Sequence, residues 1–223
     1  MWTRFDVRFE FLSSLCAGIP ADPELQKKWL ESRKPKTRPA MARSIDEIAA
    51  EVAESTLTAT EPEDSDTLLV FQRHDGALAV GMRTFRAHIK DCVSVLSSLY
   101  VGKVEGEKSF AVRAKNALYY PPDVYWVPIL DRDGRPFTEP TGVADKPVRF
   151  MTRMGPMSAI KTREFVLDAV VEFPLLVLTQ PNGKLVVSET DLKTIFMYGS
   201  THGYGPERSD GEGRYAFSIA QAT

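Results

Sequence analysis

Residues 203–214, near the C-terminus, combine residue types that can hold an anion. Four glycines form two Gly-x-Gly pairs on either side of a five-residue centre that contains Arg208, and Arg214 follows directly. Glycine backbone adopts positive φ and approaches a ligand closely, and successive amides can form an anion-binding concavity. A guanidinium binds phosphate through two parallel hydrogen bonds. We therefore predict a phosphate-binding loop that includes Gly203, Tyr204, Gly205, Gly211 and Gly213.

The plain alternative is a long glycine-rich hairpin whose arginines pair with the acidic residues Glu207, Asp210 and Glu212. Two known phosphate motifs are excluded. No Gly-Lys-Ser/Thr follows, as a Walker loop requires, and the segment leads into a predicted strand, whereas a Rossmann fingerprint leads into a helix.

A second candidate is residues 146–163, which contain five bases and no acid. Basic side chains would contact phosphates, while apolar side chains among them would insert between stacked bases. The alternative is a solvated loop with buried methionines. The bases are Lys146, Arg149, Arg153, Lys161 and Arg163, and the apolar residues among them are Phe150, Met151, Met154 and Met157.

Three histidines, His74, His88 and His202, are the candidate general acids or bases. His202 adjoins the glycine-rich loop, and His88 lies near Lys90 on a predicted helix. No orienting acid can be identified from the spacing, so we assign no catalytic residue and expect no enzyme activity.

The elements that would position these residues follow from hydrophobic periodicity. Residues 4–11 alternate as a half-buried strand, residues 85–100 have helical spacing, and residues 165–173 alternate as one long strand. Ser188 and Asp191 form a capping box for a last helix that we expect to end at Gly199. The remaining predictions are a hairpin around Asp75–Gly76, two short strands within 112–130, a final strand over 215–219, and an inserted segment over 20–67 that contains a helix starting near Ser44.

Without its insertions the order is strand, helix, strand, strand, helix, strand. This is the α+β pattern of ferredoxin-like and RRM-like folds, the split βαβ, in which two helices cover one face of a four-stranded antiparallel sheet. The other face stays open, and RNA-recognition domains stack bases on such a face.

Composition limits the functional classes. The chain has 223 residues and is 43% hydrophobic, with 28 basic and 30 acidic side chains and a net charge of −2. Bulk charge therefore does not hold it to nucleic acid or an anionic membrane, although residues 33–43 and 146–163 carry ten bases and no acid. The basic segment 33–43 is a weaker candidate for RNA contact, because such short loops are often only solvated. Cys16 and Cys92 are expected to be buried and reduced, and we expect no metal and no cofactor.

The sequence shows no signal peptide and no apolar stretch long enough to cross a membrane, so we expect a cytoplasmic protein.

The glycine-rich segment resembles the loop that marks the RAMP superfamily of CRISPR-associated proteins. That loop has the form G-h-G, five residues including Lys or Arg, then G-h-G, before the last strand of a ferredoxin-like domain. Residues 203–213 match every glycine, the spacing and the internal base, and Glu212 departs from the second hydrophobic position. In the superfamily a strand leads through a glycine-containing turn into the first helix. Residues 77–81, which lead into residues 85–90, are similar to this unit. The resemblance therefore places Arg86 and Lys90 among the expected RNA-binding residues.

The resemblance covers most of the chain outside 20–67 and implies one RAMP-like domain over 1–223. It implies a non-catalytic backbone subunit of a CRISPR-type effector complex, in which copies assemble along a guide RNA with other subunits for antiviral or anti-plasmid interference. Residues 146–163 would then be a basic thumb. The alternatives are a metal-independent endoribonuclease that processes guide RNA, and a phage or mobile-element assembly protein.

Overall fold

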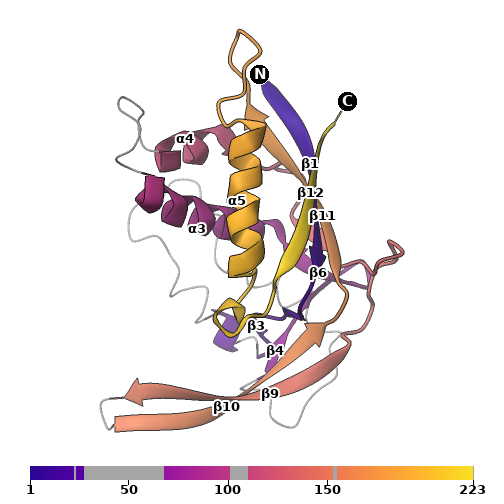
Figure 1. The fold of residues 1–223 in the computed structure, drawn as a ribbon. Coiled ribbons are helices and arrows are strands. Elements are labelled where there is room, and N and C mark those ends of the chain that lie inside the picture. The colour runs from indigo at the N-terminus through magenta and orange to yellow at the C-terminus, as the bar shows by residue number, and fades with distance from the viewer. Residues whose placement is uncertain (23, 28–67, 101–109, 153–154, 223) are drawn as a thin grey trace.

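A computed structural model describes residues 1–22, 24–27, 68–100, 110–152 and 155–222 (Figure 1). Most of the expected insertion over 20–67, including the helix predicted near Ser44 and the basic segment 33–43, lies outside the described residues. The described chain is a mixture of helices and several mainly antiparallel sheets, which confirms the α+β class.

The largest sheet has four antiparallel strands in the order β12-β1-β11-β7. They are β1 (Trp2–Phe11), β7 (Leu118–Tyr119), β11 (Val170–Leu178) and β12 (Tyr215–Gln221). The predicted alternation of β1 is confirmed, because Phe5, Val7, Phe9 and Phe11 are all buried. The first and last strands of the chain are therefore neighbours, and the segment that precedes β12 is held beside the end of β1.

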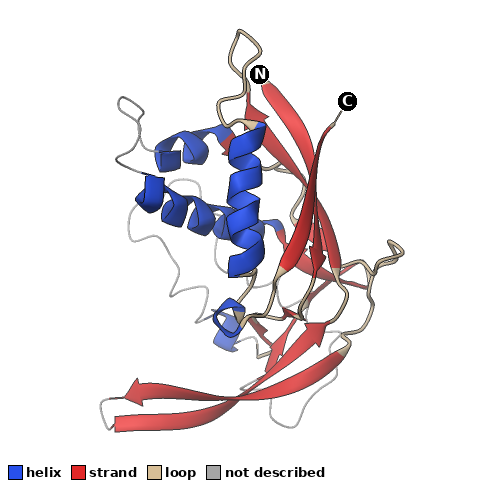
Figure 2. Ribbon diagram, in the orientation of Figure 1, coloured by secondary structure: helices blue, strands red, loops and turns tan. Residues whose placement is uncertain are grey.

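Three helices cover one face of this sheet: α3 (Met82–Tyr100), α4 (Phe110–Ala117) and α5 (Glu189–His202) (Figure 2). Aromatic packing joins the two layers. The ring of Phe9 stacks on Tyr215 with centroids 3.9 Å apart and meets Phe173 and Phe196 edge to face. The capping box of Ser188 and Asp191 is present at the start of α5, as predicted. Within the described part of the chain, none of the helices is both long and apolar enough to cross a bilayer.

One helix prediction needs correction. Helix α5 does not end at Gly199 but continues to His202, with Gly203 as its C-cap. Gly199 is buried within the helix, and a Cβ there would overlap the Tyr215 hydroxyl, so its role is to let α5 approach β12. The two short strands predicted within 112–130 are confirmed as β7 and as Trp126–Pro128, and residues 112–117 before them belong to α4, where Ala114 and Ala117 pack against the core.

The long strand predicted over 165–173 is two strands in two sheets. β10 (Gly155–Val166) ends at an exposed turn, where Asp168 has a φ of 52°, and β11 begins at Val170. β9 (Gly142–Thr152) pairs along its whole length with residues 155–165 of β10. Together they form the β9–β10 hairpin, which extends away from the helices and the four-stranded sheet (Figure 1).

Short strands join this hairpin to the body. β10 pairs with β2 (Leu15–Cys16) and with β4 (Leu68–Val70), and β4 pairs with β3 (Ile19–Pro20). A third sheet contains β5 (Gln72–His74), β6 (Ala77–Gly81) and β8 (Trp126–Pro128). The predicted hairpin at Asp75–Gly76 is confirmed, with both residues at positive φ. Cys16 and Cys92 are buried and free, as expected.

Candidate nucleic-acid interface

The two Gly-x-Gly pairs of the glycine-rich loop, residues 203–213, lie against each other. The Tyr204 amide donates to the Gly213 carbonyl oxygen at 2.8 Å. A Cβ at Gly213 would overlap the Tyr204 carbonyl, and one at Gly203 would lie 2.5 Å from the carbonyl oxygen of Glu212. All four glycines of the loop have positive φ. The paired glycines are therefore required where the two ends of the loop pack backbone to backbone.

This closure uses the amides that we expected to hold an anion. The amide of Gly203 donates to the carbonyl of Gly199, that of Gly211 to Arg208, and that of Gly213 to Ser14. Together with the Tyr204 amide, these donors are bound to protein carbonyls and are not available to a phosphate. The predicted anion concavity is therefore wrong for these four amides, and any contact with nucleic acid falls to the side chains.

Tyr204 is part of the core and not of an exposed binding surface. Its side chain is buried and stacks on Phe85 with ring centroids 4.9 Å apart, and its hydroxyl hydrogen-bonds with Thr84. Burial raises the pKa of the hydroxyl. The prediction that Tyr204 contacts RNA is wrong, because a buried ring cannot stack on a base.

Arg208 points toward helix α3. Its guanidinium lies 2.9 Å from the Asp91 carboxylate, and His202 Nε2 lies 3.4 Å from the same carboxylate oxygen. The side chains of all three residues are about one-third exposed. Arg214 is exposed, and its guanidinium lies across Gly211. Both predicted arginines therefore reach the surface, and Arg208 does so as part of a cluster with Asp91 and His202.

Glu207, in the centre of the loop, contacts three bases of the β9–β10 hairpin. Lys146 Nζ and Lys161 Nζ donate to its two carboxylate oxygens at 2.7 and 2.6 Å, and a guanidinium nitrogen of Arg163 lies at 2.8 Å. The Glu207 side chain is only 6% exposed. Burial by itself would raise the pKa of Glu207, but the hydrogen bonds from the two lysines outweigh burial and lower it to about 2.

We call Glu207 with Lys146, Lys161 and Arg163 the Glu207 cluster. Lys146 and Lys161 are direct cross-strand partners in the hairpin, where two like charges repel each other unless an acid lies between them. Lys146 also pairs with Asp210. Ion pairs thus attach the glycine-rich loop to the base of the hairpin. The partners in these ion pairs cannot be identified from the sequence.

The Glu207 cluster corrects the expectation for two predicted RNA contacts. Arg163 is buried, and both it and Lys161 are engaged by Glu207, so neither is presented to a phosphate in this arrangement. Arg149 lies further along β9, opposite Ser158, and Arg153 lies outside the described residues. Arg149, toward the end of the hairpin, therefore remains as a candidate, and Arg153 remains a prediction from the sequence.

Arg86 and Lys90 lie on the exposed side of α3, away from Arg208. They line a hollow of about 270 Å³ between α3 and α4, together with Lys115 and Tyr120. Arg208 lines a different hollow, beside the start of α3. The structure thus separates the predicted RNA-binding residues into the loop, the end of the hairpin, and the hollow between α3 and α4.

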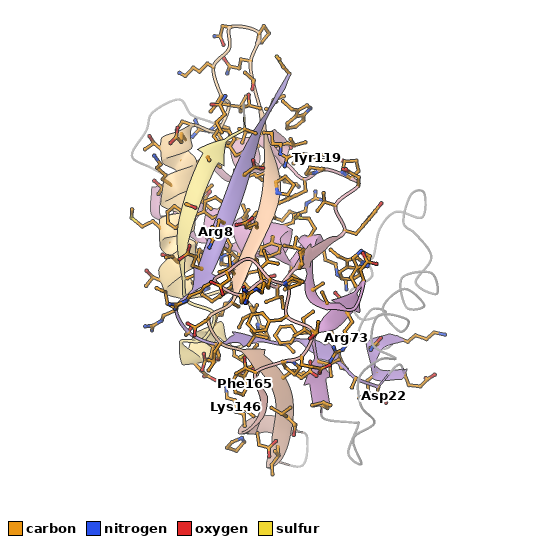
Figure 3. The ribbon with its side chains drawn as sticks, turned by 90° about the vertical axis from the view of Figure 1, so that its right-hand side faces the viewer. Arg8, Asp22, Arg73, Tyr119, Lys146 and Phe165 are labelled. Carbon is orange, nitrogen blue, oxygen red and sulfur yellow. The ribbon has the colours of Figure 1, made fainter. Side chains whose placement is uncertain are left out.

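The open face of the four-stranded sheet is covered largely by ion pairs. Arg8 pairs with both Glu10 and Glu172, and Arg4 pairs with Asp6 (Figure 3). An aromatic pair that the sequence analysis missed lies on β1 and β7: the rings of Trp2 and Tyr119, each close to half exposed, have centroids 5.7 Å apart. The central part of this face therefore offers paired charges and not a stacking surface.

The three histidines differ in environment. His74 is exposed beside Asp75 in the hairpin turn. His88 is buried, with Nε2 2.8 Å from the Tyr215 hydroxyl, and burial together with the positive charge of Arg208 lowers its pKa to about 4. His202 is in the last turn of α5, and its Nε2 lies 3.4 Å from a carboxylate oxygen of Asp91, an acid that the spacing did not identify. Among the described residues, no three His, Cys, Asp or Glu side chains gather as metal ligands.

In comparisons with known proteins, the chain matches no family model and no curated protein.

Proposed function

We propose that the four-stranded sheet and its helices form a ferredoxin-like split βαβ domain. Helices α3 and α4 lie between β1 and β7 in the chain, and α5 lies between β11 and β12. The order β12-β1-β11-β7 places the first and third strands of that motif at the centre of the sheet. The β9–β10 hairpin and the segment before β4 are then insertions.

We further propose that the protein is a cytoplasmic, non-catalytic RNA-binding subunit of the RAMP type, whose copies assemble along a guide RNA in a CRISPR-type effector complex. The observation that supports this most is the projecting β9–β10 hairpin, held at its base by the glycine-rich loop through Glu207. Such an arrangement gives a thumb of fixed direction with Arg149 toward its end.

The composition of the hairpin also suits a single strand. Arg149 and Arg153 can neutralise phosphates, while the apolar residues between them can insert between bases. Ile160 on β10 is 60% exposed and Val143 on β9 is 55% exposed, so the hairpin presents apolar surface to a partner.

The test is a gel-shift titration with single-stranded RNA at several salt concentrations. A double variant, Arg149→Glu with Arg153→Glu, should bind less tightly, and the salt dependence should weaken by about 1.4 in log–log slope, because each lost phosphate contact contributes about 0.7 for a single strand. The matched control is Arg132→Glu with Arg135→Glu, the same charge change at two exposed arginines of the turn after β8. Equal RNA affinity and equal salt dependence in the two variants would show that the hairpin does not contact the RNA.

A second measurement tests the assembly. Protein purified under low salt should contain RNA, by its absorbance ratio, and electron micrographs should show filaments or large complexes. Clean isolated particles without RNA would contradict the backbone-subunit function.

A second candidate function is metal-independent cleavage of RNA, favoured by the pairing of His202 with Asp91. A carboxylate that orients a histidine is a recurring part of general acid–base sites, and Arg208 beside it could stabilise a developing charge. Incubation of a guide-repeat RNA with the protein in chelator should then give products that the His202→Ala variant does not form. The third alternative, an assembly protein of a phage or mobile element, predicts large particles without RNA.

A further inference from the structure

Strand β12 is an outer strand of the four-stranded sheet, and within the described residues β1 is its only partner strand (Figure 3). The Ala222 amide donates to the Arg4 carbonyl oxygen at 3.0 Å, and the Leu12 amide donates to the Arg214 carbonyl oxygen at 2.7 Å. Antiparallel ladders alternate between hydrogen-bonded and non-hydrogen-bonded pairs, so the even-numbered residues of β12 bind β1. The backbone groups of its odd-numbered residues therefore face outward, at Tyr215, Phe217, Ile219 and Gln221.

This edge lacks the features that normally prevent strand pairing. Free edges in natural proteins carry charges or prolines, or are very short. β12 has seven residues, Tyr-Ala-Phe-Ser-Ile-Ala-Gln, without a charge or a proline. The opposite outer strand, β7, has only two residues, and β9, which pairs with β10 alone, contains Asp145, Lys146 and Arg149. Of these three strands, β12 is the one that can accept another strand.

The side chains of β12 alternate between the two faces of the sheet. Phe217 and Ile219 lie on the side of the helices and are only half-buried, with the Phe217 ring 5.7 Å from the ring of Phe196 on α5. A second strand at this edge would cover the apolar surface that the core leaves exposed there. The side chains on the open face are small and exposed: Ala216, Ser218 and Ala220.

The sequence of β12 is complementary to itself in reverse. In an antiparallel pair centred on Ser218, Ala216 opposes Ala220, and Phe217 opposes Ile219. Aromatic and β-branched side chains form favourable cross-strand pairs, whereas like charges directly opposite each other destabilise the pairing. A two-fold axis brings identical residues close to each other, so a strand without charges can pair with itself. In this register odd-numbered residues oppose odd-numbered residues, so outward backbone groups meet outward backbone groups.

We propose that β12 pairs antiparallel with β12 of a second copy of this chain, about a two-fold axis at Ser218. The two four-stranded sheets then form one continuous sheet, joined by the backbone groups of the odd-numbered residues. This contact goes beyond the proposed RNA-binding function, because it needs no RNA. An isologous contact closes at two copies and does not extend along an RNA strand.

The first measurement is the mass of the full chain after RNA is removed with nuclease and with about 1 M salt, which weakens contacts to phosphates. Sedimentation equilibrium at a protein concentration of about 100 μM should give twice 24.9 kDa. The dimer should persist in this salt, because uncharged strands make the contact. A monomer under these conditions would overturn the proposal and leave the RNA-binding function intact.

Cysteine cross-linking tests the register. Opposed residues of a non-hydrogen-bonded pair have Cα atoms about 4.5 Å apart, within the span of a disulfide. Ser218→Cys should therefore link two copies on oxidation with diamide, since the native cysteines are buried. Ala216→Cys, the matched control on the same face, should not link to itself, because its two copies would lie roughly 13 Å apart. A mixture of Ala216→Cys with Ala220→Cys should link.

Charge substitution tests the same contact without a covalent bond. At low salt, Ser218→Glu should raise the dimer dissociation constant about tenfold or more, because like charges would face each other across the axis. An equimolar mixture of Ser218→Glu and Ser218→Lys should restore the dimer. Ser98→Glu, at an exposed position of α3, is the control and should leave the mass unchanged. Circular dichroism separates lost association from lost folding.

Two results would place the contact elsewhere and overturn the proposal: equal self-linking of Ser218→Cys and Ala216→Cys, or a dimer that Ser218→Glu does not weaken. A dimer with the expected cross-links whose wild-type protein binds no RNA in the gel-shift titration would support the β12 contact and contradict the proposed function.

Discussion

Removing the charge of Glu207 should destabilise the whole fold, because this carboxylate joins two segments that are far apart in the sequence. In the variant Glu207→Gln, the side chain keeps its size, but Lys146, Lys161 and Arg163 lose the anion that they surround. The β9–β10 hairpin and the glycine-rich loop would then carry three close cations, and the one carboxylate left in contact with them among the described residues would be Asp210, which pairs with Lys146.

The magnitude follows from the pKa. The fold lowers the pKa of Glu207 from its ordinary 4.5 to about 2. Such a shift corresponds to about 3 kcal/mol of stability at neutral pH, which agrees with the usual cost of breaking a buried ion pair. For a chain of this length, the melting temperature should fall by roughly 6–12 °C.

The sign of the pH dependence is also fixed. A carboxylate whose folded pKa is depressed contributes its full stability above the unfolded pKa and loses it as the pH falls from 4.5 toward 2. The difference between wild type and Glu207→Gln should therefore shrink from about 3 kcal/mol at pH 7 to about 2 kcal/mol at pH 3.5.

Urea unfolding at both pH values, followed by circular dichroism, gives this difference. The control is Glu189→Gln, which breaks the exposed pair with Lys193 on α5 and should cost less than about 0.5 kcal/mol. The reasoning would be refuted by a Glu207→Gln stability equal to that of the control at pH 7, or by a difference that is the same at both pH values.

Two further predictions concern the backbone of the loop and the buried histidine. Gly213→Ala should lower the urea midpoint far more than Gly183→Ala. Both glycines have positive φ, but of the two only Gly213 would place a Cβ against a carbonyl, that of Tyr204. Similar midpoints for the two variants would reject the packing role of Gly213. His88 has a folded pKa of about 4, below its ordinary 6.5, because burial and then Arg208 disfavour its charged form. Wild-type stability should therefore fall as the pH drops from 6.5 toward 4, and His88→Gln should flatten this part of the unfolding profile; an unchanged slope would contradict the burial of a neutral imidazole.

Local patterns identified several elements correctly. The alternation of β1, the capping box at Ser188 and the Asp75–Gly76 turn depend on residues close together in the chain, so periodicity and turn chemistry were sufficient. The same patterns failed where tertiary contacts decide. The apolar alternation over 165–173 continues across Asp168, although the chain there passes from one sheet to another.

The candidate site shows the same division. The sequence identified the glycine-rich loop and the basic segment as the informative parts of the chain, but it could not pair Glu207 with Lys161 and Arg163, 46 and 44 positions away. The sequence also could not predict that Asp91 lies beside His202. These contacts depend on how β10, α3 and α5 pack.

The sequence by itself determined where backbone freedom and charge lie: the paired glycines, the acid-free segment 146–163 and the alternating strands. Composition and local spacing are enough for these features because each depends only on neighbouring residues. The tertiary structure alone decided what the residues do there. It closed the glycines against each other, buried Tyr204, and placed Lys146, Lys161 and Arg163 around Glu207, because burial and ion pairing arise only when distant segments meet.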